Sequence, residues 1–253
     1  MEIEVLREGA VATIAINRPQ RKNALTAEMY ARMDAALVEA EGDEAVRAVV
    51  FRGQPDVFTA GNDLEDFMRR PPVDDDTPVF RFLHTVAGAT KPLVAAVNGP
   101  AIGLGTTLLL HCEFVYAGDN ARFQMPFTSL GLVPEFASSY LLPLIAGYQK
   151  AAELLLLGEA FGAEEARAAG FVTRVVPAAE TFATAARTAA KLAALPASSV
   201  RATKALLRDA HRAAVAHQLR AEGDHFRRML TGPAAREAFA AFFEKRKPDF
   251  SGT

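Results

Sequence analysis

Apolar and polar residues alternate along two short stretches near the start of the chain, residues 3–6 and 11–16. A period of two is typical of strands with one buried face, and Gly9 between the stretches predicts a hairpin. The period then lengthens, because Thr26 precedes apolar residues at helical spacing. This pattern predicts an amphipathic helix that ends near Gly42.

Two uninterrupted apolar runs, residues 48–51 and 93–97, are each followed closely by a glycine. Runs of this kind predict strands that are buried on both faces. Because helical segments separate them, we expect crossover connections and a mainly parallel sheet. Prolines and charged side chains at residues 70–72 and 74–76 predict a solvated loop between the two runs. From Tyr148 onward, Ala-rich segments with Leu at helical spacing dominate, interrupted by residues 171–176 and by three prolines, and we expect this part of the chain to be helical.

Composition adds several exclusions to this picture. The 28 basic and 30 acidic residues nearly cancel, which disfavours nucleic acid and membranes as partners. Cys112 is the single cysteine and the five histidines lack metal-ligand spacing, so we expect neither a disulfide nor a metal site. The chain begins without a signal-peptide pattern, and no apolar run reaches about 18 residues. We therefore expect a soluble, cytoplasmic protein.

The candidate chemistry lies just after the two buried strands. Each strand runs into a glycine-bearing turn, at residues 58–64 and 98–105, before a new helical segment. Two such corners expose backbone N–H groups that together bind an oxygen with developing negative charge. The alternatives are two ordinary glycine turns, or a dinucleotide-binding turn around Gly103, where Leu108 replaces the third glycine of that motif.

The sequence resembles the enoyl-CoA hydratase/isomerase, or crotonase, superfamily over nearly its whole length. Five blocks carry the resemblance in order: Asn17-Arg18-Pro19 with Asn23-Ala24-Leu25, then Phe58 to Leu64, Lys91-Pro92 with Asn98-Gly99-Pro100-Ala101, Ala121-Arg122-Phe123, and Gly131-Leu132-Val133-Pro134. The resemblance implies an α/β crotonase fold of repeated ββα units with a mainly parallel sheet. It further implies a core domain at residues 1–195, which holds the active site. A helical region at 196–253 would serve oligomerisation and cover the coenzyme A.

The resemblance also implies the roles of particular residues. The backbone N–H groups of Asn62 and Leu104 correspond to the donors of the family's oxyanion hole. The two acids of the family's hydratases are replaced by Thr107 and Phe127, which cannot hold and deprotonate a water. Glu135 matches the single catalytic carboxylate of the peroxisomal-type Δ3,Δ2-enoyl-CoA isomerases.

Further positions are expected to contact the acyl-CoA thioester. They are Arg18, Lys22, Ala24, Ala60, Gly61, Asp63, Leu64, Gly103, Phe127, Phe136 and Lys245. The two lysines are candidates for the phosphates of coenzyme A, although solvated basic faces explain them equally well. Phe127, Leu132 and Phe136 are expected to line an apolar pocket around Glu135. Phe136 stands where the isomerase branch commonly has glycine, which affects the size of that pocket.

The expected activity is therefore isomerisation of a 3-enoyl-CoA, with one carboxylate making both proton transfers and no cofactor beyond the coenzyme A of the substrate. One rival is another crotonase reaction, such as weak hydration or the forming or opening of a ring. A second rival is a non-catalytic member that binds acyl-CoA or RNA. Phe239, Phe242 and Phe243 form an aromatic cluster near the C-terminus, and with the resemblance they predict a homotrimer or a dimer of trimers.

Overall fold

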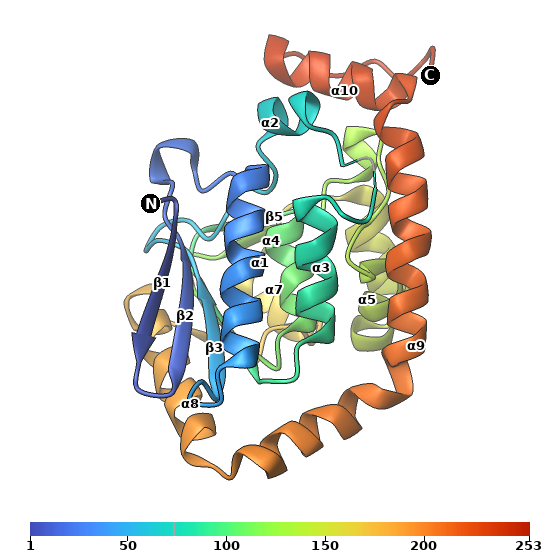
Figure 1. Ribbon diagram of the computed structural model, residues 1–253. Coiled ribbons are helices and arrows are strands. Elements are labelled where there is room, and N and C mark those ends of the chain that lie inside the picture. The colour runs from blue at the N-terminus through green and yellow to red at the C-terminus, as the bar shows by residue number, and fades with distance from the viewer. Residues whose placement is uncertain (73) are drawn as a thin grey trace.

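A mainly parallel sheet forms the centre of the protein (Figure 1). The computed structural model describes residues 1–72 and 74–253. The β1–β2 pair is antiparallel and the other neighbouring strands of this sheet are parallel, so both the hairpin and the mainly parallel sheet are confirmed. The strand order is β1 (Ile3–Glu8), β2 (Val11–Ile16), β3 (Ala48–Arg52), β4 (Leu93–Val97), β6 (Phe114–Gly118) and β9 (Arg174–Val176).

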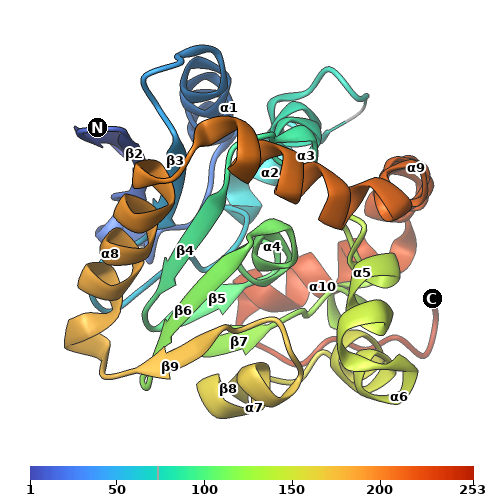
Figure 2. The same cartoon turned by 90° about the horizontal axis from the view of Figure 1, so that it is seen from below.

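β2 is buried on both faces, where the alternating pattern predicted one buried face. Figure 2 shows the reason, since α8 (Thr181–Ala194) covers one face of the sheet and α1 (Ala27–Gly42) and α3 (Pro78–Gly88) cover the other. Val11 belongs to the apolar cluster on the α8 side, and Ile14 belongs to the larger cluster on the α1 side. A parallel sheet between two helical layers buries both faces of its inner strands.

The helix predicted after Thr26 is confirmed. The Thr26 hydroxyl accepts a hydrogen bond from the Met29 N–H at 3.3 Å, which caps the first turn of α1, and the helix ends at Gly42. The other α-helices are α2 (Leu64–Arg69), α3, α4 (Leu104–Thr107), α5 (Ser138–Ala146), α6 (Tyr148–Ala152), α7 (Ala163–Ala168), α8, α9 (Ala197–Leu230) and α10 (Pro233–Glu244).

The expectation that the second half of the chain is entirely helical was wrong. β8 (Phe161–Gly162) joins β5 (Pro100–Ile102) and β7 (Arg122–Gln124) in a second sheet, and β9 extends the main sheet next to β6. These strands have two or three residues each, which is too short for a period of two to be visible. Within the described residues, no helix is both long and apolar enough to cross a membrane.

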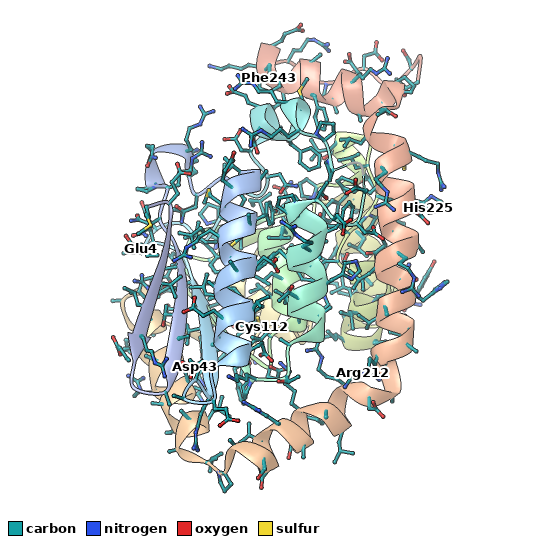
Figure 3. The ribbon with its side chains drawn as sticks, viewed as in Figure 1. Glu4, Asp43, Cys112, Arg212, His225 and Phe243 are labelled. Atoms are coloured by element: carbon teal, nitrogen blue, oxygen red, sulfur yellow. The ribbon has the colours of Figure 1, made fainter. Side chains whose placement is uncertain are left out.

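The long helix α9 brings the C-terminal part of the chain to the candidate site. It begins after Pro196 and packs against α3 and α5 along one side of the molecule, as Figure 1 shows. Its inner face carries buried Glu222 and Phe226, whereas His225 is exposed on the outer face (Figure 3). Segments far apart in the sequence, α3, α5 and α9, therefore lie side by side on one side of the molecule.

Candidate active site

The two glycine-bearing turns lie side by side. The N–H groups of Phe58 and Thr59 both donate to the Pro100 carbonyl at 3.0 Å, and the Ile102 N–H donates to the Thr59 carbonyl at 3.0 Å. Gly61 has a φ of +85°, and a Cβ atom there would lie 3.0 Å from the Ile102 carbonyl oxygen. Only glycine combines this backbone conformation with so close an approach. The ends of β3 and β4 are thus joined into one compact corner.

Asn62 and Leu104 each present a backbone N–H that donates to no protein acceptor within residues 1–72 and 74–253. On either side of Asn62, the Gly61 carbonyl accepts from Leu25 at 2.8 Å and the Asp63 N–H donates to Leu25 at 2.8 Å. The Asn62 N–H therefore points away from that pairing. Leu104 is the first residue of α4, where backbone N–H groups have no partner inside the helix. Two such donors can stabilise an oxygen that gains negative charge.

A side chain of α1 binds the residue that carries the first of these donors. The Tyr30 hydroxyl donates a hydrogen bond to the Asn62 side-chain oxygen. Tyr30 is buried, and burial and then the nearby charge of Glu135 raise the pKa of its hydroxyl well above the usual value. Tyr30 therefore contacts the first turn and has its pKa raised by burial and by the charge of Glu135.

Glu135 is a buried carboxyl group with an unsatisfied oxygen. Its side chain is 7% exposed, and its Oε1 atom has no hydrogen-bond partner among the described residues. Burial raises the pKa of Glu135 to about 8, with a further contribution from the charge of Glu222. A buried polar atom without a partner, on a group with a strongly raised pKa, is typical of a functional site.

Glu135 lines a small cavity of about 10 Å³, which is close to the least space that holds one water molecule. Phe136 lines it as expected, whereas Phe127 and Leu132 are buried in the main hydrophobic cluster without being among the lining residues of this cavity. The cavity wall comes from α2, α3, α9 and the segment that carries Glu135. Its residues are Phe67, Pro72, Val79, Phe80, Leu83, Glu135, Phe136, Leu219, Glu222, Gly223 and Phe226.

The sequence profile of the enoyl-CoA hydratase/isomerase family matches residues 7–253. The chain belongs to this family. Its predicted membership and crotonase fold are both confirmed, since an enoyl-CoA hydratase/isomerase from Pseudoalteromonas atlantica T6c has a very similar solved structure. The TM-score is 0.95 at 43% identity, and the match covers 99% of this chain and 100% of that one. Enzymes of this family act on acyl-CoA thioesters.

Curated relatives with different reactions are similar to the chain. Enoyl-CoA delta isomerase 2 of Rattus norvegicus is 43% identical over 213 residues, which cover 81% of this chain and 54% of the relative. The chain thus spans about half the length of that protein. The 1,2-epoxyphenylacetyl-CoA isomerase of Escherichia coli K12 is 36% identical over 254 residues, covering 97% of this chain and 96% of the relative.

Two residues expected to contact the coenzyme, Arg18 and Asp63, form an ion pair with each other. Arg18 Nη1 donates to Asp63 Oδ2 at 2.7 Å and to the Ala24 carbonyl at 2.8 Å. Asp63 also accepts from the first N–H groups of α2, which begins at Leu64. The ion pair fixes the first turn of the family's oxyanion corner, and its charges are already matched within the protein.

Three further coenzyme candidates lie at the two turns and at the end of α10. Lys22 lies beside the first turn, since its carbonyl accepts from the Ala60 N–H at 3.0 Å while its side chain is exposed. Lys245 is exposed at the end of α10, and no hydrogen bond or ion pair of the described residues joins it to the turn. The neighbouring Arg246 is engaged in ion pairs with Glu237 and Glu244. Gly103, with φ of +57°, immediately precedes the second donor.

The backbone that follows Glu135 is strained. Phe136 and Ala137 have φ values of +64° and +55°, in the left-handed region that favours glycine. Glycine, which the resemblance implies at position 136 in the isomerase branch, adopts this conformation without a steric cost. A left-handed non-glycine residue costs about 1–2 kcal/mol, so two in succession need strong support from their surroundings.

The sequence patterns did not single out Glu222, and of His111 they indicated only that it lacks metal-ligand spacing. Both contact the segment that carries Glu135. Glu222 accepts hydrogen bonds from the Ala137 N–H at 2.6 Å and the Ser139 N–H at 2.9 Å, and burial raises its pKa to about 7. The available signal was its helical spacing, since Leu219 and Phe226 place an acid on an apolar helix face.

Proposed function

We propose that the protein is a Δ3,Δ2-enoyl-CoA isomerase that converts a 3-enoyl-CoA to a 2-trans-enoyl-CoA. The observation that carries the proposal is Glu135, a buried carboxyl group whose Oε1 atom has no partner among the described residues. The backbone N–H groups of Asn62 and Leu104 supply the two donors that the reaction needs. Tyr30 supports the combination of these groups, because its hydroxyl donates to the Asn62 side chain and its pKa is raised by burial and by the charge of Glu135.

One carboxyl group suffices for the proposed reaction. The ionised Glu135 removes a proton from C2 of the acyl chain, and the two N–H groups stabilise the negative charge that moves onto the thioester oxygen. The protonated Glu135 then returns the proton to C4, which shifts the double bond. A pKa of about 8 makes Glu135 a stronger base than an ordinary carboxylate. The reaction requires no metal or redox cofactor.

Hydration is the weaker candidate. The buried Thr107 hydroxyl donates to the Leu104 carbonyl at 3.4 Å, and Phe127 is apolar, so neither position supplies an acid. Glu222 is a second acid in the cavity, but both of its oxygens already accept protein hydrogen bonds. A water molecule held between two free carboxylates, as hydration requires, therefore has no second base.

A spectrophotometric assay with 3-enoyl-CoA and 2-enoyl-CoA substrates of graded length tests the proposal. We expect 3-enoyl-CoA to be converted to the conjugated 2-enoyl-CoA, with little addition of water to the latter. Faster hydration than isomerisation would favour the hydratase, and no turnover with retained acyl-CoA binding would favour a non-catalytic member. An epoxide of an aryl-acetyl-CoA, the type of substrate named for the Escherichia coli relative, tests the ring-opening alternative.

We also propose that the protein forms a homotrimer or a dimer of trimers in the cytoplasm. Phe242 and Phe243 on α10 are 60% and 43% exposed, and their rings pack edge to face with centroids 5.5 Å apart. Phe243 is labelled on α10 in Figure 3. Phe239, expected in the same exposed cluster, is instead buried within its own chain. An exposed aromatic pair of this kind favours a covering partner subunit.

A further inference from the structure

Glu222 anchors the segment that carries Glu135. Its Oε2 atom accepts the Ala137 N–H at 2.6 Å, and its Oε1 atom accepts the Ser139 N–H at 2.9 Å and the Ser139 hydroxyl. Gln218, one helical turn earlier on α9, donates to the same hydroxyl at 2.8 Å. The start of α5 is therefore tied to α9 by several hydrogen bonds to one buried carboxylate.

The anchor lies where the backbone needs support. Ala137, whose N–H donates to Glu222, is the second of the two consecutive left-handed residues that follow Glu135. Hydrogen bonds to an ionised acceptor are stronger than those between neutral groups, so a carboxylate suits this position. Without these bonds the turn would be free to relax toward an ordinary conformation, and Glu135 would lose its orientation.

The same carboxylate lies across the cavity from Glu135. Among the described residues that line this cavity, Glu135 and Glu222 are the ionisable ones. Tyr30, whose pKa is raised by burial and by the charge of Glu135, and His111, which is bonded to the Phe136 carbonyl, are further titratable groups nearby. Burial lowers the pKa of His111 to about 3, so it carries no charge near neutral pH.

Two arginines also lie in this region. Arg208 is 3.4 Å from His111 Nδ1, and Arg227 lies over the ring of Phe80, which lines the cavity. Among the described residues, no hydrogen bond or ion pair joins either arginine to Glu135 or Glu222.

The hydrogen bonds of Glu222 and Glu135 determine which of the two acids ionises first. Glu222 accepts hydrogen bonds that favour its ionised form, whereas the Glu135 Oε1 atom has no partner among the described residues. Two carboxyl groups in one apolar cavity resist carrying two negative charges. The first charge falls on Glu222, and Glu135 holds the exchangeable proton.

We propose that Glu222 is a positioning residue for Glu135: its carboxylate holds the strained turn in place, and its negative charge makes Glu135 the stronger base of the two. This inference rests on the proposed isomerase function for its catalytic consequence, although the pairing itself does not. Glu222 touches the catalytic segment and not the reacting atoms. Through Glu222, α9 thereby contributes to the orientation of Glu135.

Two variants test separately the charge of Glu222 and the length of its side chain. Glu222→Gln removes the charge and keeps the size. We expect the acidic limb of the pH profile of kcat/KM to move about one pH unit toward lower pH, because Glu135 then ionises more easily. Glu222→Asp keeps the charge but shortens the side chain by one methylene. We expect it to lower kcat at least tenfold, with the acidic limb unchanged and KM altered less than threefold.

The matched control is Asp224→Asn on the exposed face of the same helix, which should change neither kcat nor the pH profile. A readout independent of activity is the carboxyl ¹³C NMR titration of Glu135, assigned by its loss in Glu135→Gln. If wild-type protein does not turn over 3-enoyl-CoA, the proposed function fails, and the NMR shift in Glu222→Gln still tests the pair.

The inference is overturned if Glu222→Gln folds normally and leaves the NMR titration of Glu135 unmoved. It is equally overturned if Glu222→Asp retains wild-type kcat. If Glu222→Gln does not fold, Glu222→Asp tests the anchoring role alone. A residue that only stabilises the fold would change both KM and kcat when it is shortened. Lowered kcat, near-constant KM and an unmoved pH limb in that variant support the inference.

Discussion

The ring of Phe136 stacks on the imidazole of His111, with centroids 4.0 Å apart and 25° between the planes. The same two residues are joined by a hydrogen bond of 2.8 Å from His111 Nε2 to the Phe136 carbonyl. Arg208 approaches His111 Nδ1 at 3.4 Å, which is compatible with the neutral ring as the acceptor. The stacking and the hydrogen bond with His111 thus offset the backbone strain of Phe136, which has a left-handed φ that favours glycine.

Substitution of Phe136 separates strain from packing. Both Phe136→Gly and Phe136→Ala lose the ring, and the loss of a buried Phe typically costs about 3–5 kcal/mol. Glycine also relieves the left-handed strain of about 1–2 kcal/mol, less about 0.5–1 kcal/mol of chain entropy. We expect Phe136→Gly to be more stable than Phe136→Ala by roughly 1 kcal/mol in urea unfolding. The opposite order would show that the backbone relaxes in the alanine variant.

Leu104 tests whether the second oxyanion donor is a backbone group. Leu104→Pro deletes the N–H, and the first position of a helix tolerates proline. Leu104→Ala loses the buried side chain but keeps the donor, so it serves as the control. We expect the proline variant to lose about 2.7–4 kcal/mol of transition-state stabilisation beyond the alanine variant. Similar kcat values for the two folded variants would exclude this donor.

Replacement of Glu135 tests the acid/base directly. In Glu135→Gln the amide keeps the volume but accepts no proton, so isomerase kcat should fall roughly 10²- to 10⁴-fold. Coenzyme A affinity, measured by calorimetry, should change little. Glu65→Gln, at an exposed acid near the first turn, is the matched control and should remain active. If the Glu135→Gln variant kept more than about a tenth of wild-type activity, Asp63 would be the next candidate base.

The raised pKa of Glu135 also predicts a pH-dependent cost to stability. Between its ordinary value of 4.5 and about 8, the folded protein holds a proton on Glu135 that the unfolded chain has released. The unfolded state binds fewer protons in this range, so this residue's contribution to stability falls as pH rises and levels off above about 8. Glu135→Gln should therefore gain stability over wild type progressively from about pH 5 to about pH 8, measured by urea unfolding. A difference independent of pH would contradict the raised pKa.

The assembly state can be measured in solution. Multi-angle light scattering at micromolar concentration should give the mass of a trimer or hexamer of the 27.1 kDa chain. The double substitution of Phe242 and Phe243 by serine removes the exposed aromatic pair, and we expect it to weaken the assembly without unfolding the chain. A stable monomer of the unaltered protein would rule the proposed trimer out.

Local patterns predicted the parts of the fold that depend on neighbouring residues. Thr26 caps α1 because its hydroxyl bonds to an N–H three residues later, and the runs at residues 48–51 and 93–97 form buried strands. Both signals are contained in a few consecutive positions. β9 was missed because three residues do not reveal a period, and its place next to β6 depends on a distant pairing.

Long-range pairing limits what the sequence reveals about the site. The turns around Asn62 and Leu104 were located from glycine patterns, and the resemblance singled out Glu135. Arg18 and Asp63 were both expected near the coenzyme, yet their ion pair joins residues 45 positions apart. No local signal encodes such a contact, because side-chain partners are chosen by the tertiary fold.

The hydrogen bond between Ala137 and Glu222 closes a loop of 85 residues. Closing a long loop has an entropic cost that must be met before the contact gives any stability. During synthesis the strands of the sheet and the catalytic segment emerge well before α9, so a growing chain can assemble the sheet while Glu135 is still poorly oriented. In refolding experiments, helical circular dichroism should consequently recover ahead of activity.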